Sequence, residues 1–271
     1  MRALEPEPHV RGQCIDSSRR PLTGDDHQPG ERKVSRSRAQ IAVAPLDGRI
    51  DLTTARVTAR TMATTIGEER RIAHAAEFAW AALSSYASHK HPSLKLSGLH
   101  HEALSPLDET SQSLAERIGE EVASLSLVEA LHYLTSLYPA MMPQRRRSEV
   151  GAFYTPPALS ERLLDLATEG GLDWGTAKVL DPAAGGGAFL VPAALRMLAS
   201  APGGEPTFVL AQLARRLSGL ELDVHAAALA QATLEIVLAE LIIVSGRPAP
   251  AFVRVGDTLE AAPSATFDLV I

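Results

Sequence analysis

The chain has 271 residues, of which 45% are hydrophobic, 21% charged and 4% aromatic, enough apolar residues for one large or two modest soluble domains. This composition excludes a collagen-like, fibrous or wholly disordered chain. Twenty-six basic and 32 acidic residues give a net charge of −6, so a polyanionic partner would have to bind a local basic patch. The single cysteine, Cys14, excludes an internal disulfide, and no apolar run reaches the roughly 20 residues that cross a bilayer. We therefore expect a cytoplasmic protein without membrane spans.

The first half of the chain predicts a tail followed by helices. Residues 1–46 mix Pro, Gly, Ser and opposite charges without a period, which predicts a disordered tail. Over 47–145 we expect a helical module, with one helix from about Thr65 and a long one over 111–138, where apolar residues recur every three or four positions. Histidines in the predicted loop that follows the first helix lack a ligand spacing and indicate no metal site; they are His89, His91, His100 and His101.

After Gly151, short β-rich runs alternate with helical runs. Strands are predicted at 177–180, 217–222, 252–255 and 267–271, and helices at 189–198 and 224–244. This alternation predicts an α/β fold with a parallel, doubly wound sheet. Right-handed crossovers then place helices on both faces of the sheet and a ligand at the carboxyl ends of the strands.

A glycine loop, Gly185 to Gly187, lies between the first predicted strand and the next helix. Asp181 ends that strand, where a carboxylate would repel a pyrophosphate but favour a ligand that carries an ammonium and a sulfonium. Phe189 and Leu190 stand where a dinucleotide pattern would have its third glycine, and no Lys-Ser/Thr pair marks a nucleotide P-loop. The charges therefore indicate S-adenosylmethionine; the alternative is a structural turn in which Asp181 only caps a helix.

Two further acids follow the second and third predicted strands. Glu221 can accept both hydroxyls of a ribose, whereas Asp223, one step beyond, is better placed to cap the helix that begins near Val224. Leu222 offers an apolar wall to a purine. Asp257 follows the third strand and can accept from an exocyclic adenine amine. Three acids at three strand ends predict one shared site.

These residues resemble the adenine-N6 DNA methyltransferases of restriction–modification systems, over about 146–271. Gly151-Ala-Phe-Tyr-Thr-Pro-Pro-Ala-Leu159 looks like the segment that this family places ahead of its glycine loop, and Asp181-Pro-Ala-Ala-Gly-Gly-Gly-Ala-Phe189 resembles its cofactor motif. In that first segment Thr155 resembles the residue that holds the methionine end of the cofactor, and it can cap a helix whose first turn accepts Pro156. The resemblance implies an S-adenosylmethionine site formed by Tyr154, Thr155, Asp181, Ala183, Gly185, Gly187, Phe189, Glu221, Leu222, Asp257 and Thr258.

The resemblance also implies a partial domain: an incomplete, doubly wound Rossmann-like class I methyltransferase sheet at 146–271. In the family, a strand like Phe267-Asp-Leu-Val-Ile271 runs into an Asn-Pro-Pro-Tyr loop that holds a flipped-out adenine, and this chain stops at Ile271. We therefore expect a fragment that is inactive alone, with no catalytic residue assigned and with DNA bound through missing C-terminal parts or a complementary chain. The family order places the strands third, second, first, fourth.

Other interpretations stay open. One is a methyltransferase of the same fold that acts on protein glutamine or RNA, and another is a non-catalytic helical interaction module with a remnant α/β domain. A nicotinamide dehydrogenase is disfavoured by Asp181 and the missing third glycine. The run Arg145–Arg147 predicts either a contact with DNA phosphates or a solvated basic turn.

Overall fold

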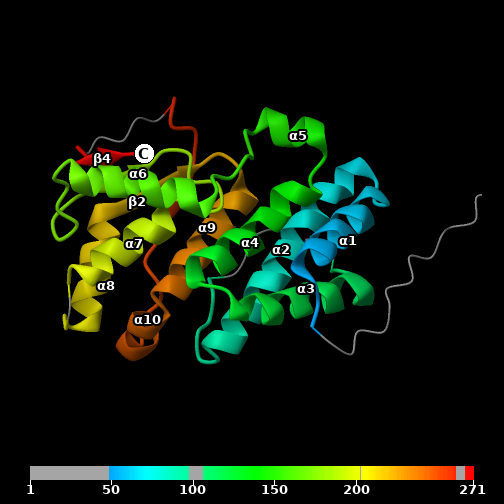
Figure 1. The fold of residues 1–271 in the computed structure, drawn as a ribbon, viewed down its shortest axis with the longest axis horizontal. Helices are drawn as coiled ribbons and strands as arrows, with labels where there is room; N and C mark the ends of the chain where they lie inside the picture. Colours follow the sequence, from blue (N-terminus) through cyan, green and yellow to red (C-terminus); the bar gives the residue numbers. More distant parts are fainter. Residues whose placement is uncertain (1–48, 98–105, 202, 261–265) are drawn as a thin grey trace, which may run out of the picture. The chain divides into compact units, whose positions relative to one another are not determined.

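The computed structural model describes residues 49–97, 106–201, 203–260 and 266–271, which all belong to one compact unit. The predicted tail at 1–46, with Cys14, lies outside these residues, as do His100 and His101. Along the described part of the chain, helices come first and a small sheet with its own helices follows (Figure 1).

The first part is a bundle of helices with a dense core. A Cβ added to Gly119 would lie 2.4 Å from the carbonyl oxygen of Ala82, so two of the helices touch backbone to backbone. Phe78, Leu83 and Ile118 are fully buried between them. The core also includes residues from a helix of the second part, so the two parts share apolar contacts. The bundle consists of α1 (Leu52–Thr64), α2 (Glu68–Lys90), α3 (Glu109–Glu121) and α4 (Leu127–Met141).

The single helix predicted over 111–138 is wrong, because the chain turns in the middle of it. A short 3-10 segment, Val122–Ser124, follows α3, and α4 starts afresh at Leu127. Ser126 forms a capping box with Glu129, in which each side chain meets the other residue's backbone N–H. The apolar spacing continues on both sides of the turn, because α3 and α4 face the same core, and this continuity hid the break.

Four parallel strands form the sheet, in the order β3-β2-β1-β4. This order confirms the predicted sequence of third, second, first and fourth strands. The register pairs Val179 with Leu217 and with Leu269, so these three side chains point to one face and are buried or half-buried there. The strands are β1 (Val179–Asp181), β2 (Leu217–Glu221), β3 (Val253–Val255) and β4 (Leu269–Val270).

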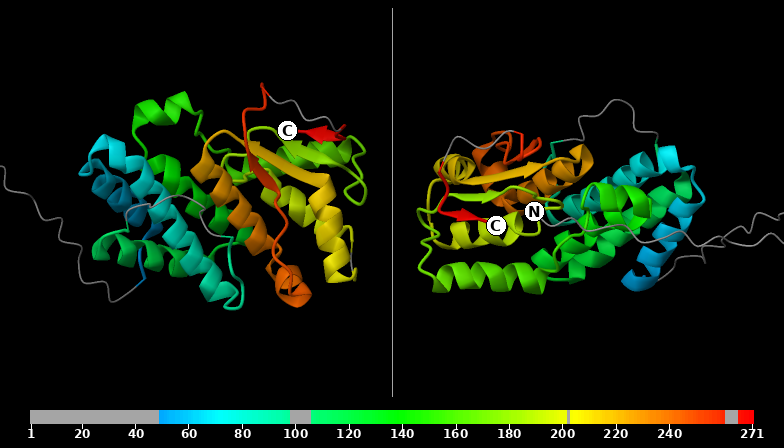
Figure 2. Two further views of the ribbon diagram at one scale, coloured as in Figure 1. Left: turned by 180° about the vertical axis from the view of Figure 1, so that it is seen from behind. Right: turned by 90° about the horizontal axis from the view of Figure 1, so that it is seen from above.

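One face of this sheet carries helices. Steps from β1 to β2 and from β2 to β3 go in the same direction across the sheet, so right-handed crossovers place their helices on the same side. On that side α7 packs against α9, and α8 against α10 (Figure 2). Among the described residues no helix covers the second face, where a doubly wound sheet would carry one. The remaining helices are α5 (Gln144–Glu149), α6 (Pro157–Glu169), α7 (Leu190–Ala199), α8 (Pro206–Arg216), α9 (Val224–Val237) and α10 (Ala239–Ser245).

Two predicted helices have different outcomes. The helix predicted at 189–198 is confirmed as α7, shifted by one residue. The one predicted at 224–244 is instead two helices, α9 and α10, bent by 73° at Leu238. No single helix in the described ranges has the length and apolar character to span a bilayer; the bent α9–α10 pair has them only when its two halves are counted together.

Candidate functional site

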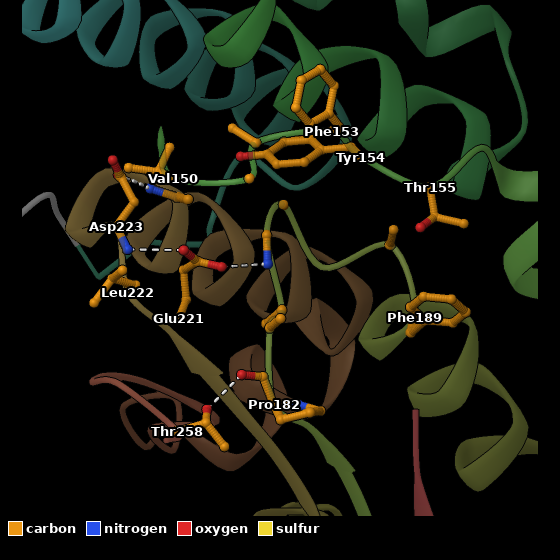
Figure 3. A pocket seen from close by; sticks show the side chains of 18 of the residues that line it. Val150, Phe153, Tyr154, Thr155, Pro182, Phe189, Glu221, Leu222, Asp223 and Thr258 are labelled. Atoms are coloured by element: carbon orange, nitrogen blue, oxygen red, sulfur yellow. Dashed lines mark hydrogen bonds between the residues drawn. The ribbon is translucent and has the colours of Figure 1, made fainter. Parts of the chain in front are cut away.

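A cavity of about 500 Å³ opens at the carboxyl ends of β1, β2 and β3. This is the edge at which parallel α/β sheets bind ligands. Loops after these three strands form its floor and one side, and the segment 150–155 forms another side (Figure 3). Nine of the predicted site residues line it, and these are Tyr154, Thr155, Ala183, Gly185, Phe189, Glu221, Leu222, Asp257 and Thr258.

The glycine loop is held tightly from several sides. Gly185 has a φ of 51°, a left-handed conformation in which a side chain would be strained. A Cβ on Gly186 would lie 2.7 Å from Thr135 of α4 and 2.7 Å from the Tyr154 ring, so a larger residue would displace one of them. Gly187 does not line the main cavity; it lies beside a smaller pocket between the loop and α4. The loop backbone is therefore fixed before any ligand arrives.

Glu221 ends β2 with its carboxylate held on both sides. The N–H of Gly185 donates to Oε2 at 2.7 Å, and the N–H of Asp223 donates to Oε1 at 2.8 Å (Figure 3). The residue is 8% exposed and lines the cavity. Each oxygen of an ionised carboxylate has two acceptor positions, so one position per oxygen remains for a ligand. Such an acceptor can receive the two neighbouring hydroxyls of a ribose.

Asp223 caps α9, as the sequence predicted, but it also borders the cavity. Its Oδ1 accepts from the N–H groups of His225 and Ala226, at 2.9 and 3.0 Å. The hydroxyl of Tyr138, from α4, donates to both carboxylate oxygens at 3.0 Å. Sequence reasoning did not assign Tyr138 to the site. The apolar neighbours and helical spacing of Tyr138 predicted only a place in the hydrophobic core. Its bond to Asp223 joins residues that are 85 positions apart in the sequence.

Asp181 does not line the cavity, although it ends β1 where the sequence placed it. It is 2% exposed; its Oδ1 accepts from the N–H of Ala183 at 3.1 Å, and its Oδ2 has no hydrogen-bond partner. Burial, together with the nearby charge of Glu221, raises the pKa of this carboxyl to about 7. The side chain is therefore a buried acid that is only partly ionised near neutral pH and whose ionised form has one oxygen without a partner.

The third acid has a different place. Asp257 is half-exposed at the rim, where its Oδ1 accepts from the N–H of Leu259 at 2.8 Å in a local turn. Thr258 ties this turn to the glycine loop, because its hydroxyl donates to the carbonyl of Pro182 at 2.6 Å (Figure 3). The structure therefore brings the loops of β1 and β3 together, with Asp257 at the edge of their shared cavity.

The segment before α6 differs from the expected helix start. Thr155 does not cap the helix; Pro156 is the N-cap residue and Pro157 is the first helical residue. Pro157, the first helical residue, has no N–H, and the N–H of Leu159 already donates to the carbonyl of Pro156 at 3.0 Å, so the first turn has few donors left for an anion. Thr155 still lines the cavity, and the buried Tyr154 hydroxyl beside it has no hydrogen-bond partner. Burial and the charges of Glu221 and Asp223 raise the pKa of Tyr154 well above its usual value.

The arginines ahead of this segment are largely paired. Arg145 and Arg146 form ion pairs with Glu149 within the six-residue α5, at 2.9 and 3.7 Å. Arg147 lies 5.5 Å over the ring of Phe153, which is 65% exposed at the cavity mouth and was not assigned by the sequence. This pairing fits a solvated basic turn as well as a contact with phosphates. In the described ranges no three His, Cys, Asp or Glu side chains gather as metal ligands.

Comparison with known proteins agrees with this geometry. A family model described as N-6 DNA methylase matches residues 132–271, more than half of the chain. The match contains every strand of the sheet and every residue that lines the cavity. No curated protein matches the sequence. From this match, the chain belongs to the N-6 DNA methylase family.

Proposed function

We propose that the cavity binds S-adenosylmethionine, and that the chain serves the methylation of adenine N6 in DNA within a restriction–modification system. Membership of the N-6 DNA methylase family implies a DNA methyltransferase with DNA as its substrate. The main observation in favour of this cofactor is the position of the Glu221 carboxylate. It faces the cavity, it is fixed by two backbone N–H groups, and it keeps acceptor positions free for a ribose.

The residues present fit this cofactor. A volume of about 500 Å³ is in the range of small-molecule pockets. Asp181 ends β1 with its Oδ2 unpartnered, and the ionised form of this carboxyl favours a ligand that carries an ammonium and a sulfonium. In the proposed arrangement Glu221 binds the ribose, Asp257 accepts from the adenine amine, Leu222 covers the purine, and Thr155 lies toward the methionine end.

When bound, the cofactor supplies a methyl group on a positively charged sulfur, which needs no further activation. The task of this chain is then to hold and orient that donor. Fixed carboxylates and a preformed loop avoid reorganisation at the moment of reaction, which is how positioning accelerates a transfer between two bound reactants. The glycine loop, packed between α4 and Tyr154, meets this need.

Calorimetry tests the cofactor assignment directly. We expect the chain to bind S-adenosylmethionine and S-adenosylhomocysteine, and Glu221→Gln to weaken both at least tenfold, because an amide removes acceptor capacity next to two N–H donors. Asp173→Asn is the matched control, since Asp173 is an exposed acid whose bonds close a local turn far from the cavity. A well-folded chain that binds neither compound would contradict the proposal and favour an inert α/β remnant.

The substrate is tested by the transfer of a tritiated methyl group. Duplex DNA, RNA and a glutamine-containing protein extract are offered to the chain, alone and with a complementary methyltransferase chain, and the labelled products are separated by chromatography. We expect N6-methyladenine from DNA. Label that enters only RNA or protein, at a cavity that binds the cofactor, would favour the alternative methyltransferases of the same fold.

A further inference from the structure

We propose that Tyr138 of α4 is a positioning residue for the ribose carboxylate of the site, and that the helix bundle thereby tunes recognition of the cofactor's hydroxyls. This inference rests on the proposed function. Tyr138 lines the cavity beside Asp223, and its hydroxyl acts on the proposed ribose acceptor through Asp223 and then through Glu221.

The contacts form an unbroken series. The hydroxyl of Tyr138 lies 3.0 Å from both oxygens of Asp223, so it straddles that carboxylate and fixes its plane. The backbone N–H of the same aspartate donates to Oε1 of Glu221 at 2.8 Å. The second oxygen, Oε2, accepts from the glycine loop at 2.7 Å. A change in the orientation of Asp223 therefore moves one of the two anchors of Glu221 and leaves the other in place.

Burial makes this series rigid. Tyr138 is fully buried, and Asp223 and Glu221 are each 8% exposed. Without the Tyr138 hydroxyl, the buried carboxylate of Asp223 would have one donor fewer.

The same helix contacts the loop as well. Thr135, one turn before Tyr138 on α4, lies against the glycine loop, where a Cβ on Gly186 would come within 2.7 Å of its side chain. One face of α4 therefore contacts both the loop and Asp223, whose backbone N–H anchors Glu221. A phenylalanine would fill the core at position 138 equally well. The hydroxyl of Tyr138 instead bonds to Asp223, a carboxylate that lines the cavity.

The experiment compares S-adenosylhomocysteine with its 3′-deoxy analogue by calorimetry on the full chain. In the wild type the ribose hydroxyl contributes to binding through Glu221, and we expect the parent compound to bind about 30-fold more tightly than the analogue. In Tyr138→Phe this preference should fall to about 3-fold, while the analogue itself binds within about 3-fold of its wild-type affinity. A purely structural effect would weaken both compounds alike and leave their ratio unchanged.

Two further variants keep the test decisive. Tyr133→Phe is the matched control, because it removes a hydroxyl from the same helix, where it donates to the carbonyl of Leu52 away from the cavity, and it should keep the full preference. Asp223→Ser retains an N-cap for α9 but is too short to reach Tyr138, and it should lose the preference even if Tyr138→Phe does not fold. An unchanged ratio in folded Tyr138→Phe, or in Asp223→Ser, overturns the inference alone. A folded wild type that binds neither compound overturns the proposed function and this inference with it.

Discussion

The carboxylates at the ends of β1 and β2 have opposite environments. Glu221, at the end of β2, receives a backbone N–H on each oxygen and lines the cavity. Asp181, at the end of β1, is more deeply buried and has one oxygen without a partner. Both end a strand that the sequence predicted, where Asp181 was expected to favour a cationic ligand and Glu221 to accept the hydroxyls of a ribose. The two carboxylates therefore differ: Glu221 is oriented to accept hydroxyl groups, whereas the ionised form of Asp181 lacks a partner for one oxygen.

This difference indicates how such a site distributes its binding energy. A carboxylate that is already hydrogen-bonded costs nothing to orient, so it serves a neutral ligand group such as a diol. A buried carboxylate without full compensation destabilises the empty protein, and a cationic ligand relieves that cost when it binds. The change from acid to amide at these two positions should therefore affect the stability of the chain with opposite signs.

The largest expected effect is on the stability of Asp181→Asn. A folded pKa of about 7, raised from 3.8, stabilises the protein below the unfolded pKa, and this contribution is lost as the pH rises through 7. Relative to the wild type, the free energy of unfolding of the variant should therefore increase by up to about 4 kcal/mol between pH 4 and pH 8. Urea unfolding of both proteins at several pH values measures the difference. A difference independent of pH would show that Asp181 is not a buried, uncompensated acid.

The opposite sign is expected for Glu221→Gln. A glutamine can accept one of the two N–H donors, but its NH₂ group then faces the other, so one buried bond is lost. We expect the variant to be about 1–2 kcal/mol less stable than the wild type at pH 8. The same urea series measures this loss of stability. The control is Asp173→Asn, whose free energy of unfolding should stay within about 0.5 kcal/mol of the wild type. If Glu221→Gln were more stable than the wild type, both acids would destabilise the protein, and the predicted difference between them would be wrong.

A third effect is on the pH dependence of ligand binding. If the charged form of Asp181 attracts the cofactor, the affinity for S-adenosylmethionine should rise about tenfold from pH 6 to pH 8, as the carboxyl loses its proton near pH 7. Calorimetry in two buffers with different ionisation enthalpies should detect a proton released on binding at pH 6. Neither the rise nor the proton should appear in Asp181→Asn, and a wild-type affinity that is flat across this range would contradict the role.

The smallest expected effect concerns the rim. Thr258→Val keeps the shape of the side chain but removes the bond to the Pro182 carbonyl that joins the two loops. We expect a loss of about 0.5–1.5 kcal/mol in stability and about 3-fold weaker binding of S-adenosylhomocysteine. Thr58→Val is a suitable control, because the Thr58 hydroxyl in α1 also donates to a backbone carbonyl, that of Thr54 at 2.9 Å, but Thr58 does not line the cavity. Equal effects of both variants would show that the tie between the loops adds nothing to the cavity.

Much of the α/β part could be predicted because its signals are local. Strand ends, the glycine run and the cap at Asp223 each depend on a few neighbouring residues, and the structure bears out the strand order that the resemblance implied. The errors arose where local signals competed. The apolar spacing across Ser126 hid a capping box, and the pair Pro156–Pro157 moved a helix start past Thr155. Tyr138 could not be found from sequence, since its partner is distant along the chain.

The shared core of the two parts has a consequence for how the chain unfolds. Ala226 and Leu229 of α9 belong to the same buried cluster as Phe78 and Leu134 of the bundle. If either part unfolds, the other loses apolar contacts of its core. Amide protons in α4 and α9 should therefore exchange with solvent in a single concerted event. Cooperative opening would also disrupt the cavity, so a bound ligand should slow amide exchange throughout the helix bundle, including α1 to α3, which do not line the cavity.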